Sequence, residues 1–235
     1  MQTMIDIRGL RKTFTLHNQH GAVLPVLNGV DLEVRAGECV VLAGESGAGK
    51  STLIRSIYAN YRAQAGEIRV RHDNRWVDMA AAEPRELLEV RRQTMGYVSQ
   101  FLRVIPRIAA IDIVAEPLLA RGVEAFAAHE RARSLLVQLN IPEKLWDLPP
   151  ATFSGGEQQR INIARGFAAE QPIMLLDEPT AALDASNRES VVELINDARA
   201  RGCAIVGIFH DEEVRDAVAT RLFTVERFKE SHVRH

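Results

Sequence analysis

Residues 44–51, Gly-Glu-Ser-Gly-Ala-Gly-Lys-Ser, fit the phosphate-loop pattern G-x-x-x-x-G-K-[ST], which is typical of a site that binds a nucleotide phosphate. A continuous apolar run precedes this stretch at 39–43, and helix-forming sequence follows it, as the pattern requires. Glycines let the backbone curl so that successive N–H groups point at phosphate oxygens, and the helix N-terminus adds its positive dipole end. Lys50 would then reach the β- and γ-phosphates, and the Ser51 hydroxyl would bind Mg²⁺. We therefore predict a nucleoside-triphosphate site at this loop.

Two carboxylates, Asp177 and Glu178, directly follow a second apolar segment at 173–176. In a protein with a phosphate loop, an acid at the end of a neighbouring buried strand belongs to the metal, so we expect Asp177 to hold Mg²⁺ through water. Glu178 lies one residue further on and can reach the water that faces the γ-phosphate, which is the position of a general base. Taken alone, the pair would also fit a strand that ends in solvated acids.

A third pattern, Ser154-Gly155-Gly156-Glu157, opens a helix after a proline-rich break. Serine is a good N-cap residue, and the two glycines leave backbone N–H groups accessible at the helix start. Alone, this pattern predicts only a capped helix.

Hydrophobic periodicity and turn residues predict the strands and helices that carry these motifs. We expect strands at 3–8, 26–35, 39–43, 97–99, 173–176 and 204–209, a hairpin of 67–71 with 75–78, and helices at 50–62, ended by Gly66, and from Pro84 to 93. Residues 101–150 carry alanine, leucine and charge at helical spacing, and prolines close the section. The pattern predicts a single α/β domain over 1–235, in which 1–100 and 160–235 form the core and a β-layer and about 101–159 form a helical insertion.

Composition narrows the classes of protein. The chain has 235 residues, 46% of them hydrophobic and 26% charged, which is typical of a globular domain. Lys and Arg total 29 against 31 Asp and Glu, and this balance argues against a nucleic-acid binder. Two cysteines far apart in sequence, Cys39 and Cys203, argue against a disulfide scaffold. Because we find no stretch that would insert into a membrane and no apolar signal core, we expect a cytoplasmic protein.

Together the three motifs resemble those of the ATP-binding cassette (ABC) ATPases, whose signature is of the Ser-Gly-Gly-Gln type; here Glu157 stands at the glutamine position. The resemblance covers nearly the whole chain. It implies a P-loop NTPase fold with a RecA-like core, an antiparallel β-subdomain and an inserted helical subdomain. It also implies ATP and Mg²⁺ as cofactors.

The resemblance carries further residues with it. Gln100 matches the Q-loop, which binds Mg²⁺ and senses the γ-phosphate, Asp184 matches the D-loop, and His210 matches the histidine that contacts the γ-phosphate. The implied catalytic residues are Glu178, His210 and Gln100, and the implied metal ligands are Ser51, Gln100 and Asp177. The implied ATP-binding residues are Phe14, Gly44, Glu45, Ser46, Gly47, Ala48, Gly49, Lys50, Ser51 and Thr52. Phe14 falls where the family stacks an aromatic ring on adenine, and core packing remains an alternative for it.

The resemblance also implies a nucleotide sandwich, in which Ser154, Gly155, Gly156 and Glu157 of one protomer face the nucleotide held by another. The expected partner is a second copy of the chain or a related cassette. No direct membrane insertion and no nucleic acid are expected.

Two interpretations of the cassette's role stay open, and the first of them carries the closer resemblance. Residues 39–68, 100–119 and 221–235 are similar to the PhnL subunits of the bacterial carbon–phosphorus lyase system, partly because no Asp-Gly turn follows the last strand. That resemblance implies a soluble component of phosphonate utilisation, a subunit of the alpha-D-ribose 1-methylphosphonate 5-triphosphate synthase. The alternative is the ATPase of a membrane exporter of the lipoprotein-release type, with 101–117 as the surface that meets the membrane subunit. A DNA- or ribosome-directed cassette is the weaker third interpretation, because such proteins usually carry paired cassettes or long coiled-coil insertions.

Overall fold

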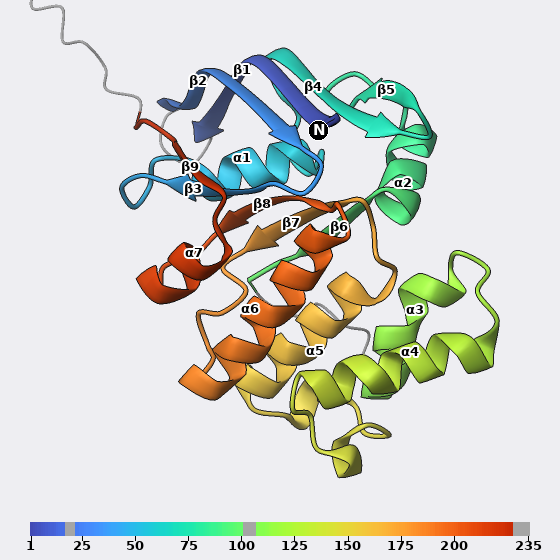
Figure 1. Cartoon of the computed structure of the whole chain (residues 1–235). Coiled ribbons are helices and arrows are strands. Elements are labelled where there is room, and N and C mark those ends of the chain that lie inside the picture. The colour runs from blue at the N-terminus through green and yellow to red at the C-terminus, as the bar shows by residue number, and fades with distance from the viewer. Residues whose placement is uncertain (17–21, 101–106, 228–235) are drawn as a thin grey trace, which may run out of the picture.

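The computed structural model describes residues 1–16, 22–100 and 107–227, which form two sheets (Figure 1). The first sheet is antiparallel, and its pleated, alternating strands cover one side of the molecule. Its strands lie in the order β2 (Ala22–Arg35), β1 (Thr3–Leu16), β4 (Ala65–His72) and β5 (Arg75–Asp78).

The second sheet is parallel throughout the described pairs and forms the centre of the fold. Its strands lie in the order β6 (Met95–Val98), β7 (Ile173–Asp177), β8 (Ala204–Ile208), β3 (Cys39–Ala43) and β9 (Arg221–Thr224). Every residue of β7 and β8 is buried, as expected for parallel strands that are covered on both faces.

The helices cover both faces of the parallel sheet (Figure 1). Helix α1 (Lys50–Ile57) lies between the two sheets, whereas α5 (Gly155–Ala168) and α6 (Ala185–Ala200) lie on the opposite face. Helices α3 (Ala110–Leu119) and α4 (Ala125–Gln138) pack beside α5. The remaining helices are α2 (Pro84–Gln93) and α7 (Glu212–Val218), with short 3₁₀ turns at Glu143–Leu145 and Pro150–Thr152.

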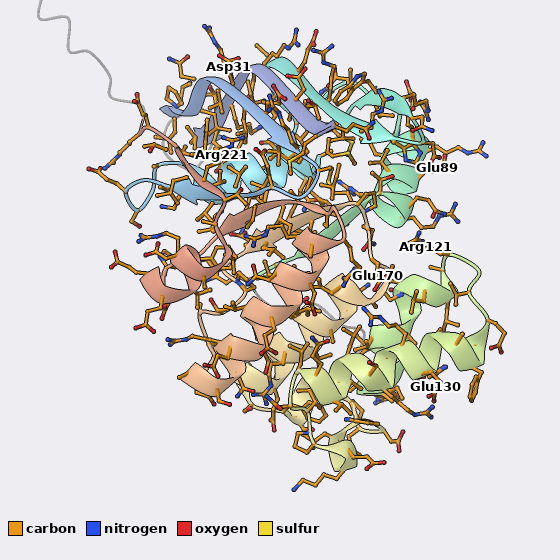
Figure 2. All side chains as sticks on the ribbon, in the orientation of Figure 1. Asp31, Glu89, Arg121, Glu130, Glu170 and Arg221 are labelled. Carbon is orange, nitrogen blue, oxygen red and sulfur yellow. The ribbon has the colours of Figure 1, made fainter. Side chains whose placement is uncertain are left out.

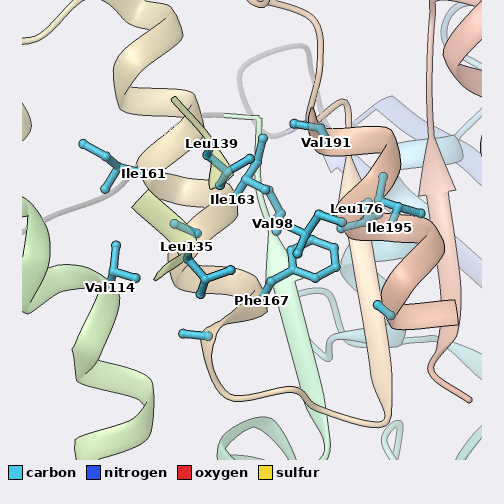
Figure 3. Packing of buried hydrophobic residues seen from close by; sticks show 14 of the residues in the cluster. Val98, Val114, Leu135, Leu139, Ile161, Ile163, Phe167, Leu176, Val191 and Ile195 are labelled. Atoms are coloured by element: carbon cyan, nitrogen blue, oxygen red, sulfur yellow. The ribbon is translucent and has the colours of Figure 1, made fainter. Parts of the chain in front are cut away.

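Strand β3 divides the buried apolar residues into two cores, because successive side chains of a strand point to opposite faces. Cys39 and Val41 join the core on the α5 and α6 side, and Val40 and Leu42 join the core around α1. Figure 3 shows the first core, in which Phe167 of α5 lies against Leu176 and Val98 on the sheet. The helical segment shares this core with the sheet, since α3 and α4 contribute residues such as Val114 and Leu135.

Charged side chains reinforce the attachment of α3 and α4 near the C-terminal end of α5 (Figure 2). Arg121, after α3, donates a hydrogen bond to the carbonyl of Ala169, and Arg131 of α4 pairs with Glu170 at 2.9 Å. Ion pairs as exposed as the second contribute little stability each. The shared apolar core therefore does most of the packing.

The structure confirms several predicted elements and corrects others. Strand 39–43, strand 75–78 and the helix from Pro84 to 93 have the predicted bounds. Helix α1 ends at Ile57, not at residue 62, because Ala59 adopts a left-handed conformation and the N–H groups of Asn60 and Tyr61 both turn back to the Arg55 carbonyl. Gly66 does not end that helix; it lies in β4.

The predicted strands 3–8 and 26–35 are also longer than expected. They run to Leu16 and from Ala22 because β1 and β2 pair along nearly their whole length. Local shifts in register interrupt that pairing. Apolar and polar residues therefore do not alternate regularly along these strands, and the sequence pattern does not reveal their full length.

Candidate functional site

The predicted motifs meet at one edge of the parallel sheet. Gly44 follows β3, Gln100 lies just beyond β6, Asp177 ends β7, and His210 lies just beyond β8. Because these strands are parallel neighbours, their carboxyl ends share one edge, which is where ligands bind in open α/β sheets.

Two glycines in the loop before α1 lie too close to other segments of the chain to carry a side chain. A Cβ on Gly44 would stand 2.5 Å from the Val225 carbonyl oxygen, and one on Gly49 would stand 2.8 Å from a methyl group of Val26, while both residues have positive φ. Glycine is therefore required at both positions. The Lys50 ammonium donates hydrogen bonds to the carbonyl oxygens of Gly44 at 2.7 Å and Glu45 at 3.0 Å, so it lies inside the curl of the loop. Residues 44–47 are exposed at the mouth of the site, and their N–H groups are accessible to an anion.

Asp177 is the most buried carboxylate of the site. Only 2% of its side chain is exposed, and the Ser51 hydroxyl donates a hydrogen bond to its Oδ1 at 2.9 Å. A serine hydroxyl and a carboxylate side by side are the hard oxygen ligands that Mg²⁺ takes, together with substrate phosphates and water. Within the described ranges no group of three or more His, Cys, Asp and Glu side chains is arranged to hold a metal. The residues thus fit an Mg²⁺ that phosphate oxygens help to bind, and such an ion would neutralise phosphate charge.

Arg55 and Tyr97 complete the surroundings of Asp177, and the sequence reasoning missed both. An Arg55 guanidinium nitrogen lies 3.5 Å from Oδ2, and the Tyr97 hydroxyl donates to the same oxygen at 3.2 Å. Burial, and then the charge of Asp177, raise the pKa of Tyr97 to about 12, so Tyr97 keeps the proton that it donates. The i, i+4 spacing of Ser51 and Arg55 on α1 was the available signal, since it puts both side chains on one helix face.

We expect Arg55→Met to lower the free energy of unfolding by about 1–2 kcal/mol, because it leaves a buried carboxylate without its cation. The full cost of breaking a buried pair, about 3–5 kcal/mol, does not apply because water screens this pair; 38% of the Arg55 side chain is exposed. Urea unfolding measures the loss. In an Asp177→Asn background the same substitution should cost much less, and an equal cost in both backgrounds would show that Arg55 does not compensate Asp177.

Glu178 is held between two other predicted residues. The Gln100 side-chain amide donates to Oε2 at 3.1 Å, and His210 Nε2 lies 2.7 Å from Oε1 and donates to it. Glu178 has a φ of 55°, a left-handed conformation that is uncommon outside glycine and that concentrates at functional sites. The turn directs the side chain away from the line of β7 and toward the ends of β6 and β8. A carboxylate so placed can accept a proton from water while the amide and the imidazole orient it.

The signature residues cap α5. Ser154 and Glu157 form a capping box, in which the Ser154 N–H donates to Glu157 Oε2 at 2.8 Å and the Glu157 N–H donates to the Ser154 hydroxyl oxygen at 3.3 Å. The Ser154 hydroxyl also donates to the carboxylate, and these bonds lower the pKa of Glu157. Glutamate at this position therefore has a local function as a helix cap. Ser154 and Gly155 remain exposed to a ligand or a second chain.

Asp184 and Phe14 have partners of their own. Asp184 caps α6 by accepting hydrogen bonds from the backbone N–H and the side-chain amide of Asn187, which lower the pKa of Asp184.

The ring of Phe14 stands edge-on to Tyr61, with centroids 5.2 Å apart, and the Lys12 ammonium lies 4.9 Å from the centre of the Phe14 ring. These contacts agree with the packing alternative for Phe14, while stacking on adenine stays a prediction. Thr52 lies half-buried in the first turn of α1.

The surface expected to meet a membrane subunit falls partly outside the described residues, which omit 101–106 of 101–117. Next to it, a cleft of about 490 Å³ opens between α2, β6, α3 and α5, and Arg91, Arg92 and Arg165 are among the residues that line it. In the described part of the chain, each helix is too short or too polar to span a bilayer.

Comparisons with known proteins show which protein family the chain is similar to. The ABC transporter family profile matches residues 27–181. The lipoprotein-releasing system ATP-binding protein LolD of Maricaulis maris is 37% identical over 231 residues, which cover 98% of this chain and 96% of LolD. The pyoverdine export ATP-binding/permease protein PvdT of Pseudomonas fluorescens is 36% identical over 218 residues, and this chain spans 32% of its length.

A solved structure agrees with the sequence relatives. The ATP-binding cassette MJ0796, described as dimeric in a post-hydrolysis state with ADP and Pi, is 29% identical, with a TM-score of 0.85 over 95% of this chain and 94% of that one. This likeness confirms the predicted P-loop NTPase cassette fold. With the profile match and the LolD likeness, it shows that the chain belongs to the ABC transporter family, as an ATP-binding cassette ATPase.

Proposed function

We propose that this chain binds Mg-ATP in the loop 44–51 and hydrolyses it with Glu178 as the general base. The main support is the position of Glu178, whose carboxylate accepts hydrogen bonds from Gln100 and His210. It lies at the same sheet edge as the Ser51–Asp177 pair. Lys50 would bind the β- and γ-phosphates, Ser51 and Asp177 would bind Mg²⁺ with Gln100 beside them, and His210 would contact the γ-phosphate.

The proposed active form is a dimer in which each nucleotide lies between the loop of one chain and the signature of another. The exposed helix start at Ser154 and Gly155 supports this arrangement, because the N–H groups of Gly155 and Gly156, which the capping box does not use, and the positive dipole end of α5 favour a phosphate. The related cassette MJ0796 is described as dimeric. The second chain would be another copy or a related cassette.

We expect two inactive variants to restore activity when they are mixed. Lys50→Ala removes the phosphate contact, and Ser154→Arg blocks the signature with a bulky cation, so each homodimer is inactive. In the mixed dimer one of the two composite sites pairs an intact loop with an intact signature. Random pairing in an equimolar mixture makes about half of the dimers mixed, so ATPase assays of the mixture should recover up to about a quarter of the wild-type rate. Lys50→Ala mixed with Lys50→Ala is the control. A mixture that stays as inactive as its parts would contradict a composite site in the homodimer.

For the partner of the dimer, the comparisons favour the membrane-exporter alternative over the phosphonate interpretation. LolD belongs by name to a lipoprotein-releasing system and is similar over nearly its whole length, and PvdT joins an ATP-binding part to a permease. The basic cleft beside residues 107–117 supports a docking partner there. A membrane permease is thus the first candidate, with the ATPase on its cytoplasmic side.

The carbon–phosphorus lyase machinery is the second candidate. Its support is the similarity of residues 39–68, 100–119 and 221–235 to PhnL subunits, which points to a cytoplasmic complex that processes phosphonates. The described residues hold a nucleotide site, and any synthase chemistry would come from other subunits.

Affinity purification of the tagged chain from its native cells, in parallel with and without detergent, distinguishes the two candidates. If the exporter proposal is right, a permease is recovered with the chain in detergent and is absent from the detergent-free soluble fraction. Recovery of soluble phosphonate-processing subunits without detergent would contradict the exporter and support the second candidate. The matched control is the tagged Lys50→Ala variant, which should retain partners that dock away from the nucleotide.

A further inference from the structure

Two buried amide side chains connect the signature helix to the chain's own site. Gln159 Nε2 donates to the Pro179 carbonyl oxygen at 3.1 Å, and Pro179 directly follows Glu178. Asn162 Nδ2 donates to the Ser99 carbonyl oxygen at 2.6 Å, and Ser99 directly precedes Gln100. Gln159 is 4% exposed and Asn162 is 6% exposed, so little water reaches either bond.

The two bonds link α5 to the two backbone segments that carry Gln100 and Glu178. Gln159 and Asn162 are three residues apart on α5, and therefore share one face of the helix. Their acceptors adjoin Glu178 and Gln100, which are themselves joined by the 3.1 Å hydrogen bond. Gly156, one turn earlier on α5, also packs closely against the segment that follows Glu178, since a Cβ on Gly156 would stand 3.2 Å from the Ala182 carbonyl oxygen. A displacement of the backbone beside Gln100 or Glu178 would therefore move a hydrogen-bond acceptor of α5.

Apolar packing alone would not give this coupling. Ile161, Ile163 and Phe167 fix α5 in the core, but apolar contacts are not directional. A buried hydrogen bond has a required geometry, and losing it leaves a carbonyl unsatisfied. The neighbouring Gln158 offers a contrast, because its amide donates at 3.0 Å to Phe153, which lies just before the same helix.

We propose that Gln159 and Asn162 are positioning residues that couple the state of a chain's own ATP site to the signature that it presents to its partner's ATP. The inference rests on the proposed function, in which Gln100 and Glu178 face this chain's γ-phosphate and Ser154 faces the other chain's. Binding at one site thereby sets the orientation of the signature at the other, so that the two sites of the dimer respond together.

Hydrogen–deuterium exchange of the monomer tests the coupling. At a protein concentration where sedimentation shows monomers, Mg-ATP in the wild type should slow exchange in the peptide that contains residues 44–51. It should also change exchange at 154–160 by about fivefold or more, the lower end of usual coupling factors. In the Gln159→Met/Asn162→Leu double variant, which keeps side-chain volume, the loop should respond as before and 154–160 should change less than about twofold. Gln158→Met is the matched control and should behave like the wild type.

The exchange data distinguish a failure of the coupling from a failure of the ATP site. An undiminished response at 154–160 in the double variant, or no response there in the wild type while the loop is protected, would overturn the coupling and leave the ATP site standing. No protection of 44–51 in the folded wild type would overturn the proposed function and the coupling with it. If the double variant fails to unfold cooperatively in urea, the single variants Gln159→Ala and Asn162→Ala replace it, and each should reduce the response at 154–160.

Discussion

The variant Glu178→Gln is expected to bind Mg-ATP and to hydrolyse it about 10²-fold or more slowly than the wild type, the usual contribution of a general base. Glutamine keeps the size of the side chain and can still contact Gln100 and His210, which hold Glu178 at 3.1 and 2.7 Å, but it cannot take a proton from water. Steady-state phosphate release and ATP titration measure the two effects separately. Because turnover is blocked, the ATP-bound dimer should also persist, which size-exclusion chromatography in Mg-ATP would detect as a larger species.

Two further variants make the result specific. Asp177→Asn should weaken the dependence on Mg²⁺, because in the proposed site Asp177 would bind the metal and would not activate the attacking water. Glu89→Gln, on the exposed side of α2, should leave both binding and hydrolysis unchanged. A Glu178→Gln protein that hydrolyses ATP at the wild-type rate, in the assembly with its partner, would place the general base elsewhere.

The second large effect is expected from Lys50→Ala, which should lower ATP affinity by about 100-fold. A hydrogen bond to a charged group contributes about 1.5–3 kcal/mol, and each 1.4 kcal/mol is a factor of ten in affinity. The carbonyls of Gly44 and Glu45 lose a donor in this variant, but both residues are exposed, so water replaces the ammonium. The free energy of unfolding should therefore fall by less than about 1 kcal/mol.

Fluorescent-ATP titration and urea unfolding of the same preparation test this result. Lys144→Ala removes an exposed lysine from a 3₁₀ turn and serves as the charge-matched control, with unchanged affinity expected. If well-folded Lys50→Ala bound ATP as tightly as the wild type, the loop 44–51 would not be the phosphate site.

The sequence predicted the glycine-rich loop and, to within one residue, the ends of β6, β7 and β8, because each motif is local. A glycine-rich turn, an apolar run and a terminal carboxylate can be recognised from a few adjacent residues. Parallel strands then bring their carboxyl ends to one edge, so Gln100, Asp177 and His210 could be placed together without any knowledge of side-chain contacts.

The remaining features depend on contacts between residues far apart in sequence. The hydrogen bonds of Gln159 and Asn162 have no sequence pattern of their own, because their acceptors are carbonyls on other segments. The positive φ of Glu178 has no sequence pattern either. Arg55 could have been found from its i, i+4 spacing to Ser51, but only after Asp177 had been placed opposite that helix face. The early end of α1 likewise depends on the left-handed Ala59, which propensity does not predict.

The most direct test of the composite ATP site is a crosslink between two different chains. The native thiols will not interfere, because Cys39 is 0% and Cys203 7% exposed and burial raises the pKa of both to about 12. Ser46→Cys chains are mixed with Ser154→Cys chains and treated with a short bis-maleimide, so that a loop and a signature can be joined only when they come from separate chains. We expect a crosslinked dimer that forms with Mg-ATP and not without nucleotide. If both variants bind ATP and no such dimer forms, the site is not shared between copies of this chain.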